Sequence, residues 1–246
     1  IRVPPLPPHA LPRERLVALL AKRLPAARLG LVAAPAGYGK TTLLAQWAGG
    51  EDAPKVAWLS LDEGDDDIER FFRYLAAAWE RAQPGVLQRE LGLLLGSVSP
   101  DNEAVLATFL NEAQGLKERT VFVLDDYHVI EDEAIHRAVT FLLDNLPSQL
   151  CFVLASRGEP PLPLARYRAR RQLVQLGPEA LHFRQGETAQ FLTTGLGLNV
   201  ADEEVARLQQ ETEGWIAALQ LAGLGLQGGG EQQGARVTPG TSPVAP

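Results

Sequence analysis

The sequence predicts an α/β fold, in which a parallel β-sheet is flanked by helices and followed by a small helical domain. Short apolar runs at 29–33, 56–61, 121–124 and 150–156 alternate with helical patterns. Such runs, bounded by turn residues, are typical of parallel strands that helices cover on both faces. Beyond Pro178 only the helical period remains. The two patterns together predict a sheet domain and then a helical one.

Composition sets the limits on function. Of 246 residues, 46% are hydrophobic and 22% are charged, as in ordinary globular proteins. The net charge of −7 argues against nucleic-acid binding by the chain as a whole. We expect no membrane span, because no apolar stretch is long enough. We expect no signal peptide either, because the N-terminus is rich in proline and lacks a charged start before an apolar core. A lone Cys151 rules out an intramolecular disulfide and favours a cytoplasmic setting. The absence of methionine suggests a piece of a longer protein.

The first 12 residues include five prolines and are expected to run extended. A leader laid against the domain is favoured over a ligand for a proline-binding module. An amphipathic helix follows from Arg13 and ends at Pro25. We therefore expect an extended leader at 1–12 and a sheet domain at 13–178.

The strand at 29–33 leads into a loop of small residues, after which a helical pattern begins at Leu43. Strand, loop and helix in this order are the context of a phosphate-binding loop, in which backbone N–H groups converge on an anion. Gly37 and Gly39 allow the positive φ that such a loop needs. An ordinary glycine-rich turn is the alternative, which the Gly-Lys-Thr-Thr ending disfavours. The predicted phosphate-binding residues are Ala34, Pro35, Ala36, Gly37, Tyr38, Gly39, Lys40, Thr41 and Thr42.

Within this loop, two side chains have predicted roles. Lys40 is expected to reach the β- and γ-phosphates of a nucleotide, and the Thr41 hydroxyl to bind Mg²⁺. Ala34 departs from the motif, which usually begins with glycine.

An acidic loop at 62–67 precedes the next helix. It fits either a cation site or a solvated loop whose carboxylates favour the helix N-terminus, and the second is expected. Residues 84–99 give weak signals. Ser99 and Pro100 then predict the start of a helix with Phe109 on its apolar face.

Two carboxylates end the apolar run 121–124, where ligands of parallel sheets bind. Asp125 is predicted to hold Mg²⁺, and Asp126 to orient or deprotonate an attacking water. The alternative is a strand end with two solvated carboxylates. His128 fits either a phosphate sensor or a hydrogen-bonded structural histidine, and the second is favoured.

Arg157 follows the strand 150–156 and is expected on the same rim. Its planar guanidinium suits a terminal phosphate, so a phosphate sensor is favoured over a structural ion pair, for example with Asp126. The run 166–171 contains four arginines and one tyrosine. A solvated helix face or a nucleotide-facing lid is favoured there over nucleic-acid binding.

The C-terminal third is predicted to contain a fifth strand at 172–176 and three short helices. A small helical domain is expected at 179–228, with its last helix opening at Gly214. The glycine-rich composition of 229–246 predicts a flexible tail.

Taken together, the segments APAGYGKTTLLAQW, VAWLSLDEGDDD, VFVLDDYHVI, CFVLASRGEPPLPLARYRAR and TEGWIAALQLA resemble the nucleotide-binding module of MalT-type regulators. These are large LuxR-family transcriptional activators within the STAND class of signal-transduction ATPases. The resemblance covers about residues 1 to 228.

The resemblance implies a P-loop fold of the ASCE type, in which the strand before Arg157 lies between the strands that end at the phosphate loop and at Asp125. It also implies that Trp215 belongs to a segment closing over the nucleotide. Either Arg13 or Arg15 matches a basic residue that precedes the loop. In this family ADP holds a monomeric form, ATP permits self-association, and other domains bind inducer and DNA.

The leading hypothesis is therefore a cytoplasmic switch module that binds ATP or ADP with Mg²⁺ and hydrolyses ATP slowly. A P-loop small-molecule phosphotransferase is an alternative, for which no acceptor motif is visible. An AAA-like mechanical ATPase acting on nucleic acid is another, against which the net charge of −7 argues.

Overall fold

The computed structural model describes residues 1–85 and 102–233. In chain order its helices and strands are α1 (Glu14–Arg23), β1 (Leu29–Ala33), α2 (Lys40–Ala48), β2 (Lys55–Ser60), α3 (Ile68–Ala82), α5 (Asn102–Gln114), β3 (Thr120–Asp125), α6 (Glu133–Asn145), β4 (Leu150–Ser156), α7 (Leu164–Ala169), β5 (Leu173–Leu176), α8 (Pro178–Leu181), α9 (Gln185–Gln190), α10 (Asp202–Thr212) and α11 (Ile216–Gln233). The helix start predicted at Ser99 and Pro100 lies outside the described residues.

The chain divides into two compact units, Ile1–Leu181 and His182–Pro246. The first contains a five-stranded sheet in the order β2-β3-β4-β1-β5, and every neighbouring pair is parallel. The predicted α/β class is confirmed, and β4 lies between β1 and β3 as the ASCE arrangement requires. No helix in the described parts of the chain is long and apolar enough to cross a membrane.

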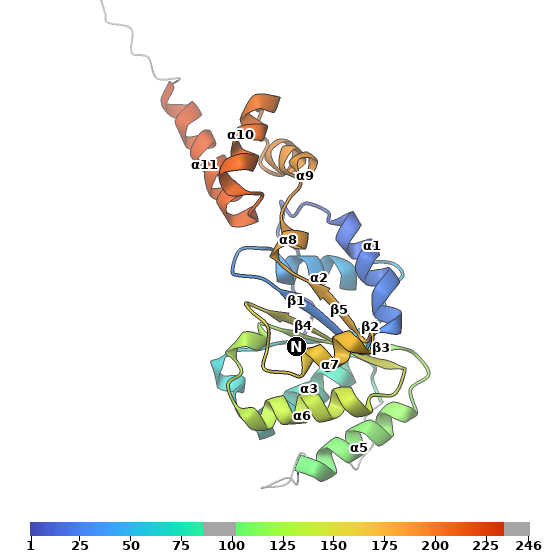
Figure 1. The fold of residues 1–246 in the computed structure, drawn as a ribbon. Helices are drawn as coiled ribbons and strands as arrows, with labels where there is room; N and C mark the ends of the chain where they lie inside the picture. Colours follow the sequence, from blue (N-terminus) through green and yellow to red (C-terminus); the bar gives the residue numbers. More distant parts are fainter. Residues whose placement is uncertain (86–101, 234–246) are drawn as a thin grey trace, which may run out of the picture. The chain divides into compact units, whose positions relative to one another are not determined.

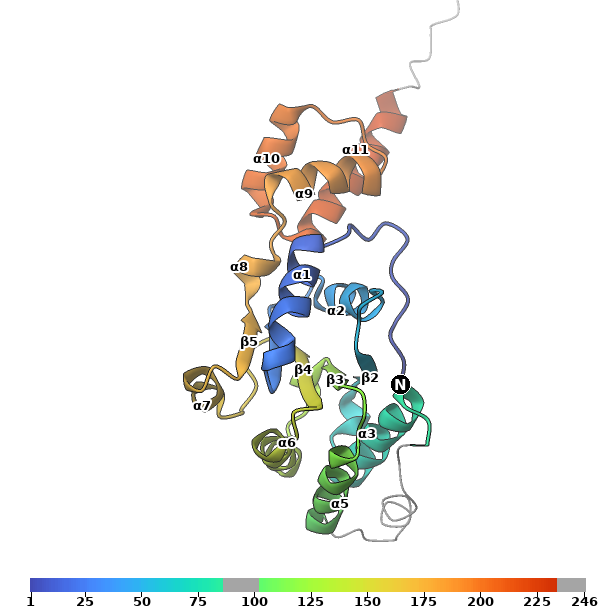
Figure 2. The same ribbon diagram turned by 90° about the vertical axis from the view of Figure 1, so that its right-hand side faces the viewer.

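Helices cover both faces of the sheet (Figures 1 and 2). α1 and α2 lie on one face, and α3, α5, α6 and α7 lie on the other. Successive strand residues point to opposite faces, so Val121 and Val123 of β3 join the α1 and α2 layer, whereas Phe122 and Leu124 join the other. Asp125 is two residues after Val123 and therefore points to the same face. The strand register thus directs its carboxylate towards α2.

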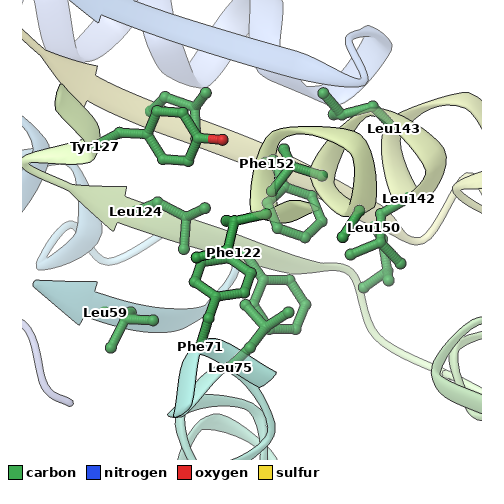
Figure 3. Packing of buried hydrophobic residues seen from close by; sticks show 14 of the residues in the cluster. Leu59, Phe71, Leu75, Phe122, Leu124, Tyr127, Leu142, Leu143, Leu150 and Phe152 are labelled. Atoms are coloured by element: carbon green, nitrogen blue, oxygen red, sulfur yellow. The ribbon is translucent and has the colours of Figure 1, made fainter. Parts of the chain in front are cut away.

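The larger apolar layer is built around aromatic rings (Figure 3). Phe122 and Phe152 stack with their ring centroids 5.0 Å apart. The ring centroids of Trp79 and Phe109 lie 4.5 Å apart. All four side chains are at most 4% exposed. Because such a core leaves little freedom to shift, it holds the carboxyl ends of the central strands in fixed positions.

In the second unit, one glycine has a left-handed conformation and lies close to a neighbouring backbone segment. Gly214 has a φ of +76°, and a Cβ atom there would lie 2.3 Å from the carbonyl oxygen of Phe183. The prediction that Gly214 opens the last helix is therefore wrong, because a left-handed residue cannot lie within a right-handed helix. It ends the turn after α10, and α11 begins at Ile216.

The end of α11 also differs from the predicted tail. The helix continues to Gln233, so 229–233 are helical although 229 was expected to begin the tail. Once a helix has formed, each added residue gains a backbone hydrogen bond, which offsets the low propensity of glycine. The rest of the predicted tail, 234–246, lies outside the described residues.

Candidate nucleotide-binding site

The predicted site residues of the first unit come together at one rim of the sheet. The phosphate loop follows β1, Asp125 ends β3, and Arg157 follows β4. Because β4 lies between the other two strands and all are parallel, their carboxyl ends are neighbours. The fold therefore places a loop of backbone N–H groups, a carboxylate and a guanidinium at one edge.

The loop has the backbone that close approach to an anion requires. Gly37 and Gly39 have φ values of 79° and 73°, which confirms the expected positive φ at both positions. Ala34 does not share this conformation, and its side chain is buried in the α1 and α2 layer. Its N–H donates to the carbonyl of Ser156 at 3.1 Å. Alanine therefore fits where the motif usually has glycine.

Lys40 is held against the loop. Its Nζ donates to the carbonyl oxygens of Ala34 at 2.8 Å and Pro35 at 3.0 Å, and the residue is buried. Burial lowers the pKa of Lys40, while the carboxylates of Asp126 and Asp125 oppose this shift. The ammonium group is thus retained at the loop by fixed acceptors that phosphate oxygens can replace.

Thr41 and Asp125 form the second contact across the rim. The Thr41 hydroxyl donates to Asp125 Oδ1 at 3.0 Å, although the two residues come from different elements. Asp125 is only 2% exposed. Burial raises its pKa from 3.8 to about 6, with the charge of Asp126 as the next cause, and the bond from Thr41 acts in the opposite direction.

This pair fits Mg²⁺ chemically. A hydroxyl and a carboxylate are hard oxygen donors, and Mg²⁺ is typically held by one or two such protein groups together with phosphate oxygens and waters. Over the described residues, no group of three or more His, Cys, Asp or Glu side chains could hold a metal ion. A cation at Thr41 and Asp125 would therefore depend on ligands from the nucleotide.

Asp126 lies directly after β3 and does not continue the strand. It has φ 58° and ψ 36°, a left-handed conformation in which Asp is enriched among non-glycine residues. This bend ends β3 and starts the short 3₁₀ turn Tyr127–Val129. About half of the Asp126 side chain is exposed to solvent. Strained residues of this kind gather at functional sites.

His128 and Arg157 complete the rim beside Asp126. The Nδ1 atom of His128 is buried without a hydrogen-bond partner in the described structure, so the favoured hydrogen-bonded histidine is not found at that atom. Burial lowers the pKa of His128, and the positive charge of Arg157 lowers it further. Arg157 itself is exposed.

No carboxylate in the described parts of the chain lies within ion-pair distance of Arg157. The alternative of a structural ion pair with Asp126 is therefore not observed. Asp126, His128 and Arg157 instead line an open recess of about 460 Å³ together with residues 61–64. The recess carries charges of both signs.

Charged residues in two other segments form hydrogen bonds and ion pairs with neighbouring side chains. Asp62 and Asp65 form a capping box, and Arg70 donates to Asp65 at 2.9 Å, as expected for a loop rather than a cation site. Two arginines of the basic run are paired. Arg166 contacts Asp144 at 2.7 Å, and Arg168 contacts Glu159 at 2.8 Å, which reduces the positive charge available to nucleic acid.

Two further residues belong to other parts of the chain. Trp215 belongs to the second unit and is 39% exposed there. Gln46 of α2 was missed by sequence reasoning. Its side-chain amide accepts from the N–H of Arg13 at 2.9 Å and donates to the carbonyl of Leu11 at 2.8 Å. A polar residue within the otherwise apolar segment 43–48 was the only sequence signal for this contact.

Comparison with known proteins identifies the family to which this fold belongs. The model of the family described as AAA domain matches residues 24–159. The chain is 40% identical over 212 residues to the HTH-type transcriptional regulator MalT of Serratia proteamaculans, covering 86% of this chain and 23% of that protein. For MalT of Yersinia enterocolitica the identity is 40% over 197 residues, covering 80% and 22%. The chain thus spans about a quarter of the length of these relatives.

Solved structures agree on the fold. A STAND protein with a tetratricopeptide-repeat sensor from Pyrococcus horikoshii superimposes with a TM-score of 0.63 at 16% identity, over 89% of this chain and 30% of that one. A Walker-type ATPase of Pyrococcus abyssi gives 0.58 at 13% identity, over 96% and 78%. With the family model covering more than half of its length, the chain belongs to the AAA domain family and is a homologue of the MalT-type transcriptional regulators.

Proposed function

We propose that this chain is the nucleotide switch of a MalT-type regulator, which binds ATP or ADP with Mg²⁺ and hydrolyses ATP slowly. The observation that carries the proposal is the contact between Thr41 and Asp125 at 3.0 Å beside a loop with two positive-φ glycines. Hydroxyl, carboxylate and convergent N–H groups are the parts that a nucleotide triphosphate requires.

The roles of the binding residues follow from their chemistry. The loop N–H groups of 36–39 would bind the phosphate oxygens, and Lys40 would exchange its two carbonyl contacts for β- and γ-phosphate oxygens. Thr41 and Asp125 would hold Mg²⁺, which supplies charge neutralisation between the β- and γ-phosphates. Asp125 must be ionised for this role. Its pKa of about 6 leaves it mostly ionised at neutral pH.

The hydrolytic residues lie on the other side of the same rim. Asp126 would orient and deprotonate the attacking water, because its exposed carboxylate borders the open recess. Arg157 would bind the terminal phosphate and so distinguish ATP from ADP. We include Trp215 as a residue of the segment that closes over the nucleotide, by resemblance to the family.

The biological setting comes from the relatives. They are named HTH-type transcriptional regulators, and this chain spans 23% of the first and 22% of the second. We propose that ATP favours self-association of the whole regulator, while inducer binding and DNA reading belong to regions outside these residues. The whole protein would act in the cytoplasm.

Calorimetry with ATP and ADP, each with and without Mg²⁺, tests the binding site. The Lys40→Ala variant is expected to lose about 100-fold or more in affinity for both nucleotides, since it removes the only side-chain cation that contacts the loop carbonyls in the described structure. Lys22→Ala, an exposed change on α1, is the matched control. Unchanged affinity in a folded Lys40→Ala protein would contradict the proposed site.

A further inference from the structure

Tyr127 connects the rim of the candidate site to helix α6. It directly follows Asp126, opens the 3₁₀ turn Tyr127–Val129, and is 1% exposed. Its ring lies in the larger apolar layer (Figure 3), and its hydroxyl lies 2.9 Å from Nδ1 of His136 on α6. The centroids of the two rings are 5.6 Å apart. The residue next to the proposed base is therefore bonded to a helix that covers the sheet.

The hydrogen bond between these two side chains has a definite direction. In the described parts of the chain, Nδ1 of His136 is the one hydrogen-bond partner of the Tyr127 hydroxyl. Burial lowers the pKa of His136, while nearby carboxylates, first among them Asp66, oppose this shift. A neutral imidazole has one nitrogen that accepts, and a tyrosine hydroxyl has one proton to donate. The hydroxyl thus donates and the imidazole accepts.

His136 stands on a part of α6 that is itself held in place. It lies in the first turn of that helix. One carboxylate oxygen of Asp66, Oδ1, accepts from the N–H groups of Glu131 at 2.9 Å and Asp132 at 2.7 Å. Asp66 belongs to the acidic loop, of which residues 62–64 line the recess of the candidate site. The start of α6, with His136 on it, is therefore tied to the wall of the recess.

The turn that Tyr127 opens needs support from outside itself. Asp126 is left-handed, a conformation that is costly for a residue other than glycine and persists only where the surroundings fix it. The N–H of Val129 donates to the carbonyl of Asp126 at 3.1 Å. The N–H of Ile130 donates to the carbonyl of Tyr127 at 3.2 Å. These two bonds lie within the turn and fix its shape, whereas the bond to His136 ties it to α6.

We propose that Tyr127 and His136 are positioning residues for ATP hydrolysis. Their hydrogen bond holds the backbone of Asp126 beside the recess, where its exposed carboxylate can meet the attacking water. This role rests on the proposed function, because it concerns the same reaction. Neither side chain forms a hydrogen bond with the phosphate loop, Thr41 or Asp125 in the described structure. The bond should therefore affect turnover and leave nucleotide binding unchanged.

Steady-state phosphate release and calorimetry on the 246-residue chain at pH 7.5 test this role. Tyr127→Phe removes the hydroxyl and keeps the ring in the apolar layer. The kcat should fall at least about tenfold, since small misplacements of a catalytic group are costly, while the Kd for Mg-ATP should stay within about twofold. Unchanged turnover, or a Kd that rises as much as kcat falls, would overturn the proposal.

Tyr167→Phe is the matched control. Tyr167 is also fully buried, and its hydroxyl donates to Asp144 Oδ1 at 3.0 Å, likewise on α6 but at a residue that does not line the recess. The kcat of this variant should stay within about twofold of the parent value. An equal fall in both variants would show a general effect of losing a tyrosine hydroxyl, and the proposal would then be wrong.

Changes at His136 show whether the bond itself matters. His136→Asn keeps an acceptor near the position of Nδ1 and should retain turnover within about threefold, whereas His136→Leu should match Tyr127→Phe. Combined with Tyr127→Phe, His136→Leu should cause little further loss, because both changes remove the same bond. Losses that multiply would overturn the pairing. The two tyrosine variants still decide the role of Tyr127 if His136→Leu does not fold.

Failure of this role can be told apart from failure of the proposed function. If the parent chain binds Mg-ATP but releases no phosphate, the proposed hydrolysis fails and the positioning role fails with it. If the parent hydrolyses ATP and Tyr127→Phe does so equally fast, the positioning role alone fails.

Discussion

The two sides of the sheet rim differ in how completely they are built. On one side, Lys40 donates to two loop carbonyls and Thr41 donates to Asp125, with contacts of 2.8 to 3.0 Å. On the other, Asp126 and Arg157 are exposed around an open recess. Binding groups that are already ordered lose little entropy when a ligand arrives, whereas exposed groups must still be brought into position. The binding side of the rim is thus better ordered than the side proposed for hydrolysis.

The largest expected effect on this contrast is a change in the rate of ATP hydrolysis. Asp126→Asn should reduce ATP hydrolysis by about 100-fold, because the amide cannot accept a proton from water. Asn tolerates the left-handed conformation observed at φ 58°, so the fold should be retained. Steady-state phosphate release measures the rate, and calorimetry should show ATP affinity within about twofold of the parent. Equal turnover in the two proteins would remove Asp126 as the base.

The ordered side of the rim was the more predictable from sequence, for a physical reason. Lys40 and Asp125 belong to local patterns, a loop between strand and helix and a strand end, whose positions follow from a parallel sheet. Other features depend on the surrounding tertiary structure. They are the bend at Asp126, the burial of His128 Nδ1, and the hydrogen bonds of Gln46 to the backbone of Leu11 and Arg13. No periodicity or spacing encodes them, and the positive φ of Gly214 was missed for the same reason.

A smaller effect concerns stability and its dependence on pH. In the folded protein Asp125 has a pKa of about 6, against an ordinary value of 3.8. The folded state thus keeps a proton that the unfolded state has lost between these values. The free energy of unfolding is therefore unaffected by this group below pH 3.8. It declines as the pH rises from 3.8 to 6, by up to about 3 kcal/mol. Above pH 6 this group makes no further difference.

Asp125→Asn isolates this contribution. The variant should be more stable than the parent at pH 7.5 by about 1–3 kcal/mol without nucleotide, and the difference should shrink towards pH 4. Urea unfolding at several pH values measures it. In the parent, the Mg²⁺-dependent part of ATP affinity should fall as the pH drops through 6, and Asp125→Asn should lack this part. A variant less stable than the parent at pH 7.5 would show that burial of Asp125 is not costly to the fold.

The smallest expected effect lies at Arg157. Because its guanidinium is exposed, with no ion pair in the described structure, removing it should leave the fold unchanged. Arg157→Ala should reduce the ratio of ATP to ADP affinity by about fivefold to tenfold, the range expected for losing a charged hydrogen bond to one phosphate. Arg170→Ala, at an exposed arginine after α7, is the matched control. An equal loss for both nucleotides would place Arg157 with the binding side of the rim, and the contrast between an ordered binding side and an open sensing side would no longer hold.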